Sequence, residues 1–156
     1  MIEIERKFLI RGHFKDCAVK SKRIKQGYLS SVPERIVRVR IVDNDAFLTI
    51  KGISNKNGTE RFEWERNIPV VEAESLLRLC ETGLIEKIRY YVPAGKHVFE
   101  VDEFYGDNKG LKIAEIELQS ENEEFEKPSW LGREVTGDIK YYNSALTKNP
   151  YKNWNK

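Results

Sequence analysis

In the stretch MIEIERKFLI, residues 1–10, the charged residues Glu3, Glu5 and Lys7 fall at every second position, and the positions between and beyond them are apolar except for Arg6. In an extended strand successive side chains point to opposite faces, so Glu3, Glu5 and Lys7 share one face and apolar side chains occupy the other. A single amphipathic strand usually turns its polar face toward water. The same mixed-charge alternation returns in later segments, however, and strands that all turn their charges one way can line an interior instead.

Segments with this two-residue period predict about eight β-strands. After residues 1–10 they are 23–30 (RIKQGYLS), 35–42 (RIVRVRIV), 46–52 (AFLTIKG), 59–69 (TERFEWERNIP), 85–92 (IEKIRYYV), 97–105 (HVFEVDEFY) and 111–119 (LKIAEIELQ). The connections between most of them are short, which favours antiparallel pairing. Eight antiparallel strands can close into a barrel wide enough to hold a small ligand.

The period changes between the fifth and sixth predicted strands. Val71, Leu76, Leu77 and Cys80 follow a 3.6-residue spacing, which predicts a helix over about residues 70–81 that ends before Gly83. The tail after residue 119 is acidic and then favours one or two short helical pieces. The predicted fold class is therefore mainly β (α+β), in a single domain of residues 1–156.

The composition indicates a folded and heavily charged protein. Of the 156 residues 40% are hydrophobic and 33% charged, while 27 Lys and Arg against 25 Asp and Glu leave a net charge of +2, too little to attract nucleic acid globally. We expect Cys17 and Cys80 to be reduced thiols. No apolar stretch reaches the roughly 18 residues of a membrane span, and the start is too charged for a standard signal peptide. We therefore expect a cytoplasmic protein without a membrane partner. The oligomeric state is open, and a homodimer is compatible with the sequence.

Charged pairs fall on one face of strand after strand. The basic pairs are Arg38/Arg40 and Lys87/Arg89, the acidic pairs are Glu63/Glu65, Glu100/Asp102 and Glu115/Glu117, and Lys51 stands alone on the fourth strand. Like charges two residues apart repel one another on an open surface and gain nothing there. One helix and a short tail, moreover, cover only part of eight strands.

Two arrangements remain open from the residues alone. An apolar barrel interior leaves most charges in water, whereas a polar interior places six cations and eight carboxylates around a tunnel. The second arrangement is costly without a ligand. Lys and Arg bind phosphate oxygens, and hard Mg²⁺ or Mn²⁺ takes carboxylate oxygens. Segregated acidic and basic pairs suit a metal–triphosphate complex better than they suit either ion alone.

These motifs, in this order, resemble those of the CYTH domain family, the triphosphate tunnel metalloenzymes. The resemblance rests on the following motifs: E-x-E-x-K at residues 3–7, QGYL at 26–29, R-x-R at 38–40, TIKG at 49–52, E-x-E at 63–65, K-x-R at 87–89, Asp102, E-x-E at 115–117 and GREVTGDIKYYN at 132–143. It covers residues 2–148, the expected core. It implies a closed eight-stranded antiparallel barrel with its charged face inward, a triphosphate-containing small molecule as substrate, and Mg²⁺ or Mn²⁺ as cofactor.

The resemblance also implies roles for individual residues. The expected phosphate-binding cations are Lys7, Arg38, Arg40, Lys51, Lys87 and Arg89, with Lys140 at the tunnel mouth. The expected ligands of the main metal are Asp102, Glu115 and Glu117. Glu3 and Glu5 are expected to serve a second metal or the attacking water, Glu63 and Glu65 to orient metal or water, and Tyr28 to hydrogen-bond the reacting end.

The small size of the chain is most like that of bacterial inorganic triphosphatases, so we expect hydrolysis of inorganic triphosphate to pyrophosphate and phosphate. Two alternatives remain. One is an organic-triphosphate enzyme of the same fold, either a thiamine triphosphatase or an adenylate cyclase, although no segment clearly supplies a pocket for a heterocycle. The other is a non-catalytic polyphosphate-binding module, which the many carboxylates disfavour because anion binding alone needs only cations.

Overall fold

The computed structural model describes residues 2–156 and consists mainly of antiparallel strands. The strands are β1 (Ile2–Ile10), β2 (Lys20–Ser30), β3 (Ile36–Val42), β4 (Asp45–Lys51), β5 (Glu60–Ile68), β6 (Ile85–Ala94), β7 (His97–Phe104), β8 (Lys112–Glu117) and β9 (Leu131–Glu134). The helices are α1 (Val70–Leu77) and α2 (Asn143–Leu146), with short 3₁₀ turns η1 (Lys15–Cys17), η2 (Gly106–Asn108), η3 (Ile139–Tyr141) and η4 (Tyr151–Asn153).

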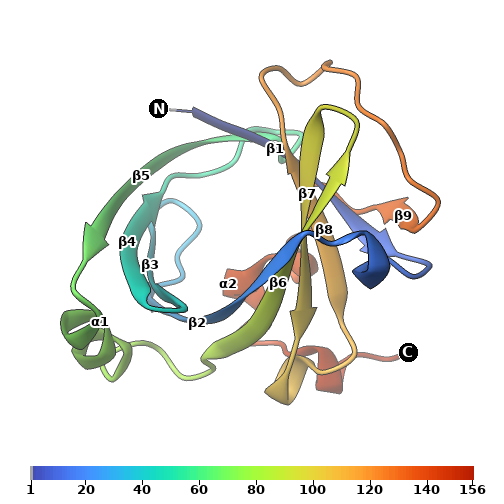
Figure 1. Ribbon diagram of the computed structural model, residues 1–156. Helices are drawn as coiled ribbons and strands as arrows, with labels where there is room; N and C mark the ends of the chain where they lie inside the picture. Colours follow the sequence, from blue (N-terminus) through green and yellow to red (C-terminus); the bar gives the residue numbers. More distant parts are fainter. Residues whose placement is uncertain (1) are drawn as a thin grey trace.

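Eight of these strands close into a barrel. The strand order is β5-β4-β3-β2-β6-β7-β8-β1, and β5 pairs again with β1 to complete the ring seen in Figure 1. Every pairing is antiparallel. The predicted fold, a closed eight-stranded antiparallel barrel with a few flanking helices, is confirmed. Closure gives the sheet an inside and an outside.

The tail contains short helical pieces, η3 and α2, as predicted, but it also adds a ninth strand that was not predicted. β1 pairs with β5 only through Ile2–Ile4, so the same edge of β1 lies open farther along. β9 occupies that edge, with Phe8 opposite Glu134 and Ile10 opposite Leu131. Backbone donors and acceptors on a strand edge need partners, and this long-range requirement overrides the local preference of the tail.

The helix α1 also ends earlier than predicted, at Leu77 instead of near residue 81. The amides of Leu79 and Cys80 bond to carbonyls three residues back, which tightens the last turn, and the amide of Glu81 bonds to the carbonyl of Tyr28 on β2. The chain therefore leaves the helix to return to the barrel wall. In the described residues no helix is long and apolar enough to cross a membrane, and Cys17 and Cys80 are free thiols.

The apolar face of the sheet points outward and is covered locally. The helix α1 packs Ala73 and Leu77 onto Val39 of β3 and Ala46 of β4, and it lies outside the ring in Figure 1. On the opposite side, the segments that flank β1 and β9 bury a larger cluster. Its members include Phe8, Phe14, Phe99, Ile116 and Trp130. Because the apolar side chains are used on the outside, the alternating charged side chains must face inward.

One end of the barrel is filled by the C-terminal segment. Ile85, Phe104 and Ile113 project from β6, β7 and the start of β8 and pack against Tyr141 and Leu146. The helix α2 is visible through the ring of strands in Figure 1. This packing places the residues just before and within α2 against the charged interior.

Candidate active site

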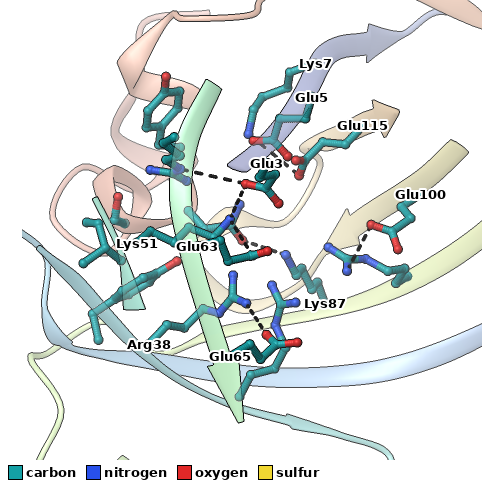
Figure 2. Close-up of a pocket in the computed structure, with 18 residues that line it drawn as sticks. Glu3, Glu5, Lys7, Arg38, Lys51, Glu63, Glu65, Lys87, Glu100 and Glu115 are labelled. Atoms are coloured by element: carbon teal, nitrogen blue, oxygen red, sulfur yellow. Dashed lines mark hydrogen bonds and ion pairs between the residues drawn. The ribbon is translucent and has the colours of Figure 1, made fainter. Parts of the chain in front are cut away.

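The barrel interior holds a cavity of about 210 Å³ whose lining is almost entirely polar. Figure 2 shows its side chains converging from the strands on a common space. The charged lining residues are Glu3, Glu5, Lys7, Arg38, Arg40, Lys51, Arg61, Glu63, Glu65, Lys87, Arg89, Glu100 and Glu115. The arrangement with charges inside is therefore the one that the chain adopts.

Cross-strand register brings opposite charges together on part of the wall. Lys51 lies opposite Glu63 in the β4–β5 pair. Its Nζ is 3.6 Å from the Glu63 carboxylate and 3.0 Å from Glu3 Oε1. On β1, Lys7 faces Glu115 of β8, with 3.8 Å between Nζ and Oε2. These pairs compensate buried charge without saturating the ammonium groups, which leaves donors for an incoming anion.

Asp102 lies behind the cavity lining and anchors two of its cations. The Asp102 carboxylate accepts two hydrogen bonds from the Arg89 guanidinium, at 2.8 and 3.0 Å, and lies 2.7 Å from Lys87 Nζ. Asp102 is only 2% exposed. Burial alone raises the pKa of a carboxyl, yet the charges of Arg89 and Lys87 lower the pKa of Asp102 to about 2. This carboxylate is therefore ionised and holds Lys87 and Arg89 in place.

Cations outnumber their partners on the wall formed by β2, β3 and β6. Burial, together with the charges of Arg89 and Arg40, lowers the pKa of Lys87 to about 7 despite the ion pair with Asp102. Burial and the neighbouring charges of Arg38 and Arg89 lower the pKa of Arg40 to about 9. Arg38 Nε is a buried donor without an acceptor. An anion in the cavity would stabilise the charged forms of Lys87 and Arg40 and would supply an acceptor for Arg38 Nε.

Carboxylates gather on the wall formed by β7, β8 and β1. Glu100 stands opposite Glu115, and Glu5 opposite Glu117, in the strand register. Like charges at directly opposed positions destabilise a sheet. Burial and the adjacent charge of Glu115 raise the pKa of Glu5 well above its ordinary value. A hard divalent cation relieves this repulsion, and carboxylate oxygens are the ligands it prefers.

The interior charges and the folded barrel now permit comparison with known proteins. The family model described as "CYTH domain" matches residues 1–148. The chain belongs to the CYTH domain family. It is 49% identical over 153 residues to the inorganic triphosphatase of Acetivibrio thermocellus, with 97% of each chain covered. It is 38% identical to the inorganic triphosphatase of Nitrosomonas europaea, over 94% of this chain and 97% of that protein. The crystal structure of the inorganic triphosphatase NE1496 superposes with a TM-score of 0.67, at 35% identity and 93% coverage of each chain.

Most of the residues predicted from the CYTH motifs line the cavity. They are Glu3, Glu5, Lys7, Tyr28, Arg38, Arg40, Lys51, Glu63, Glu65, Lys87, Arg89 and Glu115. Asp102 lies just behind the lining. Glu117 is exposed, shares a face of β8 with Glu115 and lies opposite Glu5 in the strand register. Burial together with the charges of Glu3, Glu63 and Glu100 raises its pKa.

Two expectations differ from the observed placement. Lys140 does not reach the tunnel mouth, because its Nζ packs 4.8 Å from the Trp154 ring centroid and 5.3 Å from that of Tyr141. The three acidic residues expected to bind the main metal do not converge: within residues 2–156, no three His, Cys, Asp or Glu side chains are grouped as a metal centre. Asp102 is instead turned to Lys87 and Arg89.

Some lining residues were not among the predicted site residues. Arg61 shares the two-residue period of Glu63 and Glu65, so that signal was available in the sequence. Tyr142, Asn143 and Ser144 come from the C-terminal segment. They lie within or next to the motif GREVTGDIKYYN, but neither strand periodicity nor helix periodicity indicates which of its side chains turn into the barrel.

Proposed function

We propose that this chain is a metal-dependent inorganic triphosphatase, which hydrolyses tripolyphosphate to pyrophosphate and phosphate inside the barrel. The observation that carries the proposal is a polar cavity inside the barrel, with cations gathered on one part of its wall and carboxylates on another. A polyanion fits the first wall and a divalent cation fits the second. The names of the two relatives with 49% and 38% identity support the same substrate.

The cations of the cationic wall, together with Lys7 of β1 and Lys51 of β4, would hold the phosphate chain. Lys7, Arg38, Arg40, Lys51, Lys87 and Arg89 all line the cavity. Arg40 uses its Nε to bond Gln26 Oε1 at 2.8 Å, so its terminal nitrogens remain available. A phosphate oxygen near Arg38 would also satisfy the buried Nε that lacks an acceptor. Arginine can bind two phosphate oxygens at once, which makes this wall suited to a triphosphate.

The acidic wall would hold the metal. CYTH triphosphatases are metal-dependent in general, and the residues on the acidic wall fit this requirement. We assign Glu5 and Glu115 as ligands of a Mg²⁺ or Mn²⁺ ion, with Glu3 and Glu117 close to the same region. Asp102 was also predicted to be a ligand, but we assign it to the positioning of Lys87 and Arg89. When bound, the cation supplies positive charge to the phosphate oxygens as a Lewis acid.

The remaining polar groups would orient the attacking water. Glu65 Oε1 accepts a hydrogen bond from Thr49 at 2.5 Å and lies 3.5 Å from Arg38 NH2, so one carboxylate oxygen is fixed beside a phosphate-binding cation. Glu63 lies next to Lys51. The Tyr28 hydroxyl accepts a bond from Gln26 Nε2 at 3.2 Å and keeps its own proton for the reacting phosphate. Positioned cations and a carboxylate that accepts the proton of the water are the main requirements for phosphoryl transfer.

A second candidate, an organic triphosphate as substrate, is favoured by a neighbouring cavity. A space of about 320 Å³, more apolar than the tunnel, shares Ile36, Arg61, Tyr142 and Ser144 with it. No segment of the sequence clearly indicated such a pocket. It offers room for an organic group joined to a triphosphate held in the tunnel.

The two candidates are separated by measuring phosphate release from tripolyphosphate, ATP and thiamine triphosphate with Mg²⁺ and with Mn²⁺, and by examining the ATP reaction for cyclic AMP. A strong preference for tripolyphosphate supports the proposal. A preference for either organic substrate, or formation of cyclic AMP, rejects the inorganic substrate while keeping the tunnel. Tight binding without turnover indicates a polyphosphate-binding module.

A further inference from the structure

Asn143, the first residue of α2, connects the C-terminal segment to the cationic wall. It is half-buried and lines the tunnel cavity. Its side-chain oxygen Oδ1 accepts a hydrogen bond from Lys87 Nζ at 2.8 Å and a second from Gln26 Nε2 at 3.2 Å. The oxygen therefore has two donors, which is the capacity of a carbonyl with two lone pairs.

The chemistry of the neighbours fixes which way the Asn143 amide points. In its ammonium form, which Asp102 stabilises at 2.7 Å, Lys87 has only donors, so the atom beside Nζ is the amide oxygen and not the nitrogen. The orientation of Gln26 is fixed in the same way, because its Oε1 accepts from Arg40 Nε at 2.8 Å and its NH₂ group must then face Asn143. Gln26 is fully buried, so water does not offer it other partners. A continuous chain runs from Arg40 through Gln26 and Asn143 to Lys87.

This orientation leaves the Asn143 nitrogen available as a donor. Within residues 2–156, Asn143 Nδ2 has no hydrogen-bond partner. Among the same residues, Arg38 Nε is the only side-chain nitrogen or oxygen that is both buried and without a partner. Nδ2 is therefore accessible. Tyr142 and Ser144, on either side, line both the tunnel and the neighbouring apolar cavity, whereas Asn143 lines the tunnel alone.

We propose that Asn143 is a substrate-binding residue, whose Nδ2 donates to a phosphate oxygen beside the ammonium group of Lys87. Gln26 is the positioning residue that sets the amide. This inference rests on the proposed function, since the phosphate is that of the tripolyphosphate substrate. The amide adds a donor that stays uncharged at every working pH, next to cations whose mutual repulsion already limits how many can share the wall.

The test exchanges the nitrogen for an oxygen and leaves the shape unchanged. Asn143→Asp keeps an acceptor for Lys87 and Gln26 but turns the second oxygen toward the phosphate. We expect KM for tripolyphosphate to rise about 10- to 100-fold, as for the loss of a hydrogen bond to a charged group, and to rise more than in Asn143→Ala. Asn149→Asp is the matched control: it adds the same charge at an exposed position of the same segment and should leave KM unchanged. Thermal unfolding verifies that each variant is folded.

If Asn143 only supports the packing of α2 or fixes Lys87 through its oxygen, the order of the KM values of Asn143→Asp and Asn143→Ala reverses. Asn143→Asp then keeps a KM near that of the wild type, and Asn143→Ala is the more impaired variant. That result overturns the proposal.

A direct readout separates the hydrogen bond from a general effect of the added charge. In a ¹⁵N-labelled sample the side-chain NH₂ resonances of Asn143, assigned by their absence in Asn143→Asp, should shift when tripolyphosphate is added without a divalent cation. Unmoved resonances with the ligand bound overturn the role of Asn143 alone. A wild-type protein that binds tripolyphosphate and shifts these resonances, but does not hydrolyse it when metal is supplied, contradicts only the proposed function. Absence of both binding and hydrolysis overturns both.

Discussion

Replacing Asp102 by Asn removes the negative charge that anchors Lys87 and Arg89, and we predict a large loss of stability. The ordinary pKa of 3.8 falls to about 2 in the folded protein. This lowering of the pKa corresponds to about 2 kcal/mol of folding free energy at neutral pH. Breaking a buried ion pair by removing one partner typically costs about 3–5 kcal/mol, because the other charge stays buried. We therefore expect Asp102→Asn to lower the free energy of unfolding by about 2–5 kcal/mol at pH 7.

The pH dependence follows from the sign of the shift. A carboxyl whose pKa is lowered on folding contributes stability that is fully present above its unfolded pKa and is lost as pH falls through the folded pKa. For Asp102 the contribution is complete above about pH 5, and about half of it remains at pH 3. Urea denaturation of wild type and Asp102→Asn at several values between pH 3 and 7 should show a stability difference that narrows toward acid.

The matched control is Asp107→Asn, which removes an exposed carboxylate 3.0 Å from Lys152 Nζ. Exposed ion pairs contribute about 0–1 kcal/mol, so this variant should differ little from the wild type. If Asp102→Asn costs no more than Asp107→Asn, or if its effect does not vary between pH 3 and 7, the assignment of Asp102 as the ionised anchor of the cationic wall is wrong.

Further predictions concern the two walls and the docking of the C-terminal segment. Because the pKa of Lys87 is lowered to about 7, its ammonium form is lost above that pH. Calorimetry should therefore show that the affinity for tripolyphosphate falls more steeply between pH 6 and 8.5 in the wild type than in Lys87→Arg, which stays charged. An equal dependence of affinity on pH in the two proteins would contradict this. If Glu115 binds the metal, Glu115→Gln should raise the Mg²⁺ concentration needed for half-maximal activity, and an unchanged metal titration would remove that assignment. A Cβ added at Gly58, which has a positive φ of 76°, would lie 2.4 Å from Gly137 Cα. Gly58→Ala should therefore destabilise the protein by more than the roughly 1 kcal/mol expected for Gly106→Ala, where φ is also positive but space is open. Equal melting temperatures of the two variants would argue against close packing of Gly58 against Gly137.

The strand periodicity was sufficient to predict most of the barrel and most of its lining, because period 2 fixes which side chains share a face. Glu3, Glu5 and Lys7 in the opening stretch illustrate this. Periodicity did not decide whether that face lay inside, since closure depends on the pairing of β5 with β1 across the whole chain. The motif resemblance supplied that answer.

The misplaced and missing residues all depend on long-range contacts. The resemblance to the CYTH family led us to expect Lys140 at the tunnel mouth, but its Nζ lies beside the rings of Tyr141 and Trp154. Asn143 carries no charge and lies on no alternating strand, so no local pattern indicates its contact with Lys87. Strand β9 forms only because β5 leaves part of the β1 edge unpaired. Such features follow from the folded barrel and not from local sequence.

The most direct test of the central claim is to follow the products of tripolyphosphate by ³¹P nuclear magnetic resonance in the presence of the protein and Mg²⁺ or Mn²⁺. The account predicts that pyrophosphate and phosphate appear in equal amounts as tripolyphosphate disappears, and that the reaction stops when the cation is chelated. Tripolyphosphate that binds but persists, or a reaction that proceeds unchanged after chelation, would contradict it.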